Sequence, residues 1–205
     1  MTPIHCLVFG ATGRTGSAFV GQAVAAGHRV TAFVRNAATE LPGAVEVTTG
    51  DVLDRASVAA AVRAEHIVII ALGGVEALTT GGANVVAAAV SAGARRVLGV
   101  VGAGVLPADA TRVRSELPDY PPRLQPIGAA HRALYHALRD SSLDWTLACT
   151  PRISDAPRTD AYRSSADALP DGTGAISTED IAAFLLVESV ESKFVRRRVG
   201  LNGTK

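Results

Sequence analysis

The chain has 205 residues, of which 48% are hydrophobic, and a formal net charge of +1 at pH 7. This length and composition predict one α/β domain with an adequate core, and so small a net charge argues against nucleic-acid or anionic-membrane partners. Apolar runs stop well short of a membrane span and residues 1–9 lack the flanks of a signal peptide, so we expect a cytoplasmic protein.

The first motif is the glycine-rich segment Gly10-Ala11-Thr12-Gly13-Arg14-Thr15-Gly16. It lies between a short apolar, β-branched run, Ile4–Phe9, and an alanine-rich segment, Ser17–Ala26, whose apolar residues have helical spacing. We predict a strand, a tight turn and a helix, in which backbone N–H groups and the helix dipole contact a pyrophosphate. The alternative is a structural turn without a ligand.

The second predicted strand, Arg29–Val34, ends in Arg35 rather than in an acidic residue. A carboxylate at this position hydrogen-bonds the adenosine ribose of NAD, whereas an arginine pairs with the 2′-phosphate of NADP. Arg35 therefore predicts NADPH as the cofactor, with NADH as a weaker donor. Arg14 would add positive charge beside the phosphates, and Glu40 would oppose it. The alternative is a solvated arginine at a strand end.

Apolar β-rich and alanine-rich segments then alternate along the chain, which predicts repeated βα winding. The expected fold is a single Rossmann-type, doubly wound parallel sheet with helices on both faces. The expected elements are the strands Ala44–Thr48, His66–Leu72 and Arg96–Val101, and the helices Asp54–Ala64 and Gly82–Ala92.

The carboxyl ends of these strands are where a ligand crevice is expected. Asp51 and Val52 follow the third strand, where Asp51 can lie beside the adenine amino group. Leu72, Gly73 and Gly74 follow the fourth strand, where backbone can pass close to the ribose. Either segment alone could be a simple turn, but together they favour the cofactor.

The second half of the chain is less regular. Residues 106–126 hold five of the ten prolines, which is typical of a binding loop, and we expect this segment and residues 151–176 to form small substrate-side elements of the single 1–205 domain. The other expected elements are the helix Ile127–Asp140, the strand Asp144–Thr150, a loop through about Gly174, the helix Thr178–Val190 capped by Ser177, and the strand Arg198–Leu201.

Cysteine and histidine spacing predicts neither a disulfide nor a metal site. Cys6 and Cys149 fall in core strands on opposite halves of the expected sheet, so we expect two buried free thiols. The five histidines are not at zinc spacing with the cysteines. The run Arg196–Arg198 is expected to be a solvated edge.

Several segments together resemble an atypical short-chain dehydrogenase/reductase: the glycine turn, Val34-Arg35, Gly50–Leu53 and Ala71–Gly73. The chain is more specifically similar to the biliverdin-IXβ reductase/flavin reductase family in Pro121–Gln125, His131, Leu138-Arg139 and Pro151–Asp155. This resemblance implies hydride transfer from NADPH to a flavin, a biliverdin-like linear tetrapyrrole or a quinone-like acceptor in an open pocket. It assigns residues to the cofactor site, His131, Pro151 and Ile153, and to the substrate pocket, Gly102, Ala103, Arg123 and Arg152.

The chain lacks the Tyr-x-x-x-Lys pair of the wider superfamily, because Ile127 and His131 take its place. We therefore assign no catalytic residue, and the missing proton donor argues against alcohol/ketone chemistry. Gly102 and Arg152 also stand where the reductase family has serine and histidine. The fixed cation of Arg152 would suit a flavin phosphate or a propionate.

Two functions follow from these residues. The first is an oxidoreductase, an NADPH-dependent flavin or biliverdin reductase acting on a small planar acceptor. The alternative is a non-catalytic NADP(H)-binding redox sensor, similar to regulatory atypical short-chain dehydrogenases, which would act through a protein partner. Turnover of NADPH separates the two.

Overall fold

The structure, a computed structural model, describes residues 2–38, 40–43 and 45–204. An eight-stranded sheet in the order β3-β2-β1-β4-β5-β6-β10-β8 forms its centre. The strands are β1 His5–Phe9, β2 Arg29–Val34, β3 Glu46–Thr49, β4 His66–Ile70, β5 Arg96–Gly102, β6 Trp145–Thr150, β8 Tyr162–Ala166 and β10 Arg197–Gly203. All neighbouring pairs are parallel except β10 with β8.

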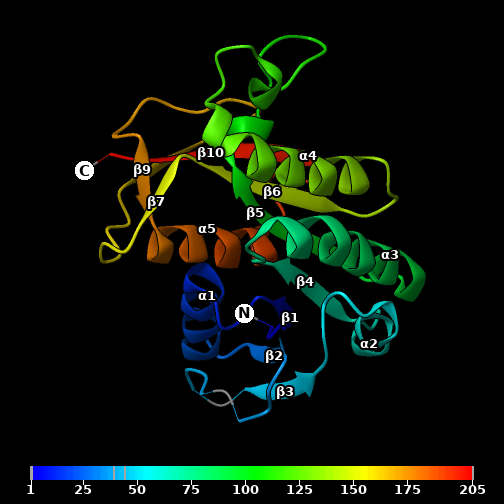
Figure 1. Ribbon diagram of the computed structural model, residues 1–205. Helices are drawn as coiled ribbons and strands as arrows, with labels where there is room; N and C mark the ends of the chain where they lie inside the picture. The colour runs from blue at the N-terminus through cyan, green and yellow to red at the C-terminus, as the bar shows by residue number, and fades with distance from the viewer. Residues whose placement is uncertain (1, 39, 44, 205) are drawn as a thin grey trace.

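Helices cover both faces of this sheet (Figure 1). They are α1 Arg14–Ala25, α2 Arg55–Ala61, α3 Gly82–Ala92, α4 Gln125–Arg139 and α5 Thr178–Glu191. Successive side chains of β1 point to opposite faces of the sheet, so they belong to two different hydrophobic cores. Leu7 and Phe9 pack with residues of α2, α3 and α4, whereas Cys6 and Val8 pack with residues of α1 and α5. The predicted doubly wound, Rossmann-type sheet is thereby confirmed.

Most predicted elements occur within a few residues of their expected bounds. The strand Arg29–Val34 and the helix Gly82–Ala92 match, and Ser177 caps α5 by accepting a hydrogen bond from the Asp180 N–H. The expected strand Ala44–Thr48 begins at a position outside the described residues, and the observed β3 is Glu46–Thr49. Cys6 and Cys149 are buried and unpaired, as predicted.

The loop expected through Gly174 is wrong in part, because it contains strands. The segment β8 pairs antiparallel with β10, and β7 Arg152–Ser154 forms a small separate sheet with β9 Ala175–Ser177. The edge strand β8 is mostly exposed and polar, so no apolar alternation marks it in the sequence.

Arg196 and Arg197 are exposed, as expected of a solvated edge, whereas the Arg198 side chain is largely buried, so the interpretation is wrong for Arg198. Arg196 donates hydrogen bonds to three backbone carbonyls, those of Ser141, Leu143 and Arg139. The Arg198 guanidinium bonds the Asp167 carboxylate at 3.0 Å and lies 4.6 Å from the centre of the Tyr135 ring. These arginines therefore tie β10 to the ends of α4 and β8.

No helix in the described part of the chain combines the length and apolarity needed to cross a bilayer. The order of the strands in the central sheet indicates where a ligand would bind. Parallel strands leave their carboxyl ends at one edge, and the chain order reverses between β1 and β4. In open α/β sheets this reversal is where ligands bind.

Candidate functional site

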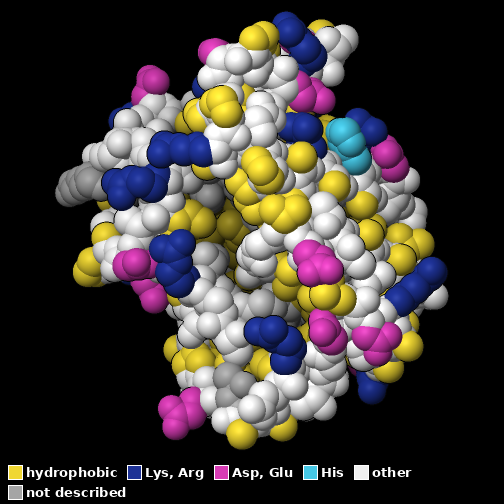
Figure 2. All heavy atoms as spheres, in the orientation of Figure 1, with side chains coloured by type: hydrophobic (Ala, Val, Ile, Leu, Met, Phe, Trp, Pro, Cys, Tyr) yellow, Lys and Arg dark blue, Asp and Glu magenta, His cyan; other side chains and the backbone are white. Residues whose placement is uncertain are grey.

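A cleft lies at the carboxyl ends of the strands, over the reversal between β1 and β4. It consists of two adjoining cavities of about 500 and 400 Å³, which share Gly13 and residues 71–74 as common wall. Figure 2 shows the molecule hollowed near the middle of the face that it presents. A cleft of this size at the switch point can hold an extended, two-part ligand.

The glycine turn forms the floor of the cleft, and a different contact explains the glycine at each of its three positions. Gly10 has a φ of +87°, and a Cβ there would lie 2.3 Å from the Ala71 carbonyl oxygen. A Cβ on Gly16 would lie 2.0 Å from the Gly10 carbonyl oxygen. Gly13 faces both cavities and donates its N–H to the Gly10 carbonyl at 3.0 Å. The turn therefore brings α1 against β1 while leaving backbone open to a ligand.

Helix α1 begins at this turn without a side-chain cap. Gly13 is its N-cap residue, and no side chain in the described part of the chain accepts from the first-turn N–H groups as a cap. Those N–H groups have no partners within the helix and carry the positive end of its dipole. Arg14 and Thr15 from this turn line the smaller cavity. The start of α1 is thus chemically suited to a diphosphate.

The larger cavity collects residues predicted for the pyrophosphate, from the glycine turn, and residues predicted for the adenosine half of a dinucleotide. Its lining includes Gly10, Thr12, Gly13, Arg35, Asp51, Val52, Leu72, Gly73 and Gly74. Arg35 is exposed at the end of β2, where its guanidinium can reach a ligand at the rim. One carboxylate oxygen of Asp51 accepts the Leu53 N–H at 2.9 Å, which holds this turn in place.

One acidic residue at this cavity was not anticipated from the sequence. Glu76 is part of the lining, whereas Glu40, the acid expected to oppose Arg35, is exposed and outside it. Glu76 follows the loop after β4, and no motif distinguishes it from other surface acids. Glu76 therefore adds to the negative charge that Asp51 already brings to this cavity.

The smaller cavity is mostly apolar and contains His131. Leu78, Val100, Ile127, Pro151 and Ile153 line it, together with Thr150, whose hydroxyl lies 3.4 Å from the Val101 carbonyl oxygen. Ile127 and His131 lie one turn apart on α4, and the structure brings both to this wall, where the resemblance placed them. The lining also includes Gly102, at the end of β5.

The tautomer and the protonation state of His131 follow from its hydrogen bond and its burial. Its Nδ1 accepts the Gly102 N–H at 3.2 Å, which assigns the ring proton to Nε2. Burial lowers the pKa of His131 to about 4, so the ring is neutral at pH 7 and offers one N–H donor. A Cβ at position 102 would lie 3.2 Å from Nδ1, which is tight. Glycine at this position therefore allows the close approach of His131.

The other residues assigned to the substrate pocket lie outside these two cavities. Ala103 lines a neighbouring hollow of about 370 Å³ with Gly104, Tyr120 and Leu169. Arg123 and Arg152 are exposed and belong to the lining of neither half of the cleft. The structure thus unites the predicted cofactor residues, but it does not bring these two arginines into the cleft.

An ion pair joins the glycine turn to the segment after β7. The Arg14 guanidinium lies 3.0 Å from the Asp155 carboxylate, and both side chains are more than half exposed. The charge of Arg14 is therefore shared with Asp155, which the sequence did not indicate because the two positions are 141 residues apart.

Residues 10–191 match the NAD(P)H-binding family. A proposed exported protein of Burkholderia pseudomallei is 31% identical, with a TM-score of 0.83 over 97% of this chain and 99% of that one. A proposed NADH-flavin reductase of Streptococcus pneumoniae TIGR4 is 25% identical, with a TM-score of 0.83 over 98% and 100%. ChuY, an anaerobillin reductase from Escherichia coli O157:H7, is 22% identical, with a TM-score of 0.79 over 97% of each chain, and shares the fold.

Proposed function

The chain belongs to the NAD(P)H-binding family, and from this premise we propose that it is an NADPH-dependent reductase. Its acceptor would be a small planar ring system: a flavin, a linear tetrapyrrole or a quinone. The structurally similar S. pneumoniae protein, a proposed NADH-flavin reductase, supports a flavin among these acceptors. The observation that carries the proposal is the makeup of the smaller cavity, which offers an apolar wall and a neutral histidine but no acid.

The cleft fits a dinucleotide by its shape and its donors. A Cβ at Gly10 or Gly16 would strike backbone, so the turn keeps the uncapped start of α1 against the cleft. The first-turn N–H groups would hold the diphosphate, and Asp51 would contact the adenine. His131 would donate its Nε2–H to the nicotinamide ribose. Arg35 would pair with a 2′-phosphate, which makes NADPH the preferred donor.

When bound, the nicotinamide supplies a hydride. The protein would contribute position: the apolar wall around Ile127, Val100 and Ile153 excludes water and holds an acceptor ring beside the reacting edge. Among the described residues that line this cavity there is no tyrosine, lysine or carboxylic acid to donate a proton. The acceptor must therefore tolerate the added charge until water protonates it, as delocalised flavin and quinone anions do.

The test measures binding and turnover separately. NADPH binding is followed by calorimetry, and NADPH oxidation by its absorbance, with FMN, FAD, riboflavin, a quinone and biliverdin offered in parallel and NADH as the comparison donor. We expect saturable oxidation with at least one acceptor and tighter binding of NADPH than of NADH. Binding without oxidation by any acceptor would overturn the reductase and favour a redox sensor.

A further inference from the structure

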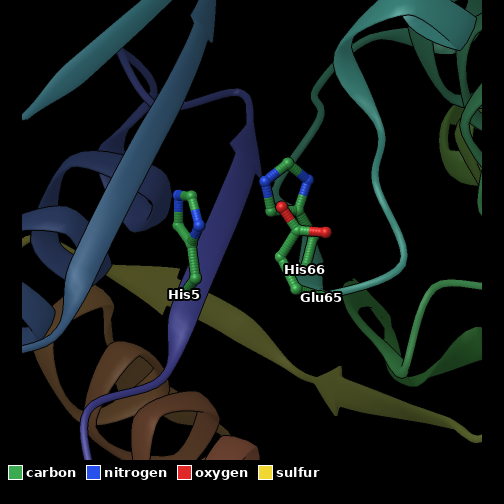
Figure 3. Close-up of side chains that lie close together, drawn as sticks. All are labelled: His5, Glu65 and His66. Atoms are coloured by element: carbon green, nitrogen blue, oxygen red, sulfur yellow. The ribbon is translucent and has the colours of Figure 1, made fainter.

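Two histidines meet at the edge of the sheet opposite the cleft. His5 begins β1 and His66 begins β4, and the parallel register pairs them directly. Their side chains lie on the same face, with ring centres 4.5 Å apart and ring planes at 84° (Figure 3). The pairing brings together positions 61 residues apart, so no local sequence spacing reveals it.

Glu65 completes a cluster with these rings, which we call the amino-edge cluster: His5, Glu65 and His66. One ligand atom from each of the three residues lies within 4.8 Å of the others. Glu65 is exposed in the turn before β4, and Figure 3 shows its carboxylate beside the His66 ring. His5 and Glu65 also line a surface hollow of about 460 Å³.

A hydrogen-bond relay from His5 through Thr31 to Glu46 determines which nitrogen of the His5 ring carries no proton. The Thr31 hydroxyl lies 2.8 Å from His5 Nε2 and donates its proton to Glu46 Oε2 at 3.2 Å. Arg29 in turn donates to the other Glu46 oxygen at 3.0 Å. Because the hydroxyl proton is directed to Glu46, the hydroxyl oxygen accepts from His5 Nε2–H. His5 Nδ1 then carries a lone pair, and this buried nitrogen has no hydrogen-bond partner among the described residues.

We propose that the amino-edge cluster binds a divalent transition-metal ion of the zinc class. Two imidazoles and one carboxylate are a three-ligand set that zinc uses, with water completing a tetrahedron, whereas Mg²⁺ and Ca²⁺ prefer oxygen ligands. The relay through Thr31 and Glu46 has the outer-shell arrangement that orients ligating histidines. The exposed Glu65 side chain can close the remaining distance to an ion held between the rings.

His66 provides a direct reporter of occupancy. Its Nδ1 accepts the Arg63 N–H at 3.1 Å, which assigns its proton to Nε2. A metal on either nitrogen must change this arrangement, because it takes the place of the Arg63 N–H or requires the proton to move to Nδ1. Zinc binding should thus shift the Arg63 amide resonance.

The experiment uses the full chain without a polyhistidine tag, stripped with EDTA. Zn²⁺ and Mg²⁺ are titrated by calorimetry, and Co²⁺ is followed by its visible absorption. We expect one equivalent of Zn²⁺ and no saturable Mg²⁺ binding. Glu65→Gln and His5→Asn remove ligands, and Thr31→Val removes the relay; each should weaken zinc binding at least ~10-fold. His136→Asn and Glu191→Gln change exposed residues elsewhere and should leave it unchanged.

Glu65 is exposed, so its variant keeps the test independent of folding. Unchanged zinc affinity in Glu65→Gln, or a stoichiometry that falls only in His136→Asn, would overturn the assignment. An Arg63 amide that stays in place while one equivalent of Zn²⁺ binds would also overturn it, since the ion would then lie elsewhere. A rise in the melting temperature with Zn²⁺ that Glu65→Gln abolishes supports the site.

Discussion

Substituting alanine at Gly16 tests whether the glycine turn is shaped by packing. Alanine is a better helix former than glycine by about 0.5–1 kcal/mol, so propensity alone predicts a more stable α1. The structure predicts the reverse, because the added Cβ would lie 2.0 Å from the Gly10 carbonyl oxygen and both atoms belong to well-packed backbone. The turn and the helix must separate by about 1 Å, and overpacking of this kind costs about 1–3 kcal/mol.

Gly21→Ala is the matched control, since it makes the same change in the same helix. A Cβ at Gly21 meets the Pro42 side chain at an ordinary 3.6 Å. We expect Gly21→Ala to raise the free energy of unfolding by up to about 1 kcal/mol and to leave NADPH binding unchanged. Gly16→Ala should lower both, because a positioned group displaced by about 1 Å can lose roughly 100-fold in function.

Urea unfolding followed by circular dichroism measures the first effect, and calorimetric titration with NADPH measures the second. If Gly16→Ala were as stable as Gly21→Ala and bound NADPH as the parent does, the reasoning from close packing would be refuted. A stable Gly16→Ala that failed to bind would show instead that glycine serves ligand approach alone.

Three other predictions concern charge. Arg35→Asp should weaken NADPH binding about 10- to 100-fold and NADH binding much less, measured by calorimetry; equal losses would remove Arg35 as the phosphate contact. Because burial lowers the pKa of His131 to about 4, the unfolded state binds more protons between pH 6.5 and 4, and stability falls as the pH is lowered through that window. Urea unfolding should show a shallower fall in His131→Asn, and an identical pH profile would contradict the buried neutral ring. Glu188 accepts hydrogen bonds from buried Arg96 and from the Phe194 N–H, so Glu188→Gln should cost about 3–5 kcal/mol. In thermal denaturation an Arg96→Met/Glu188→Leu double variant should recover only part of this loss, because the Phe194 N–H then lacks its acceptor.

The first half of the chain was largely predictable because each of its elements carries its own signal. Strands β1, β2 and β4 are short apolar runs buried on both faces. The alanine-rich helix α3, which follows β4, has a clear end at Gly93, whose φ is +65°. Strand β8 carries no such signal, since its side chains are mostly exposed and only its pairing with β10 defines it.

The arginines in the second half of the chain show a second reason why contacts could not be predicted from the sequence. The sequence places Arg198 in a run of three cations, which ordinarily lie in solvent. In the fold it is 15% exposed and lies between the Asp167 carboxylate and the Tyr135 ring. Those partners come from distant segments, so only the assembled sheet shows that this cation is packed. The pairing of His5 with His66 could not be predicted from the sequence for the same reason.

The side chains that line the smaller cavity restrict the possible reaction more than the residues of the glycine turn do. Reduction of a ketone leaves an alkoxide that must be protonated or stabilised at once, and a neutral imidazole with a pKa near 4 is a poor source of protons at pH 7. Ile127 has no proton to donate. A flavin or quinone spreads the added charge over its rings, so a planar acceptor of this kind is the substrate that we propose for the apolar cavity. If the proposed acceptor is a flavin, we expect Ile127→Tyr to leave the rate of NADPH oxidation unchanged, because a delocalised anion needs no proton from the protein.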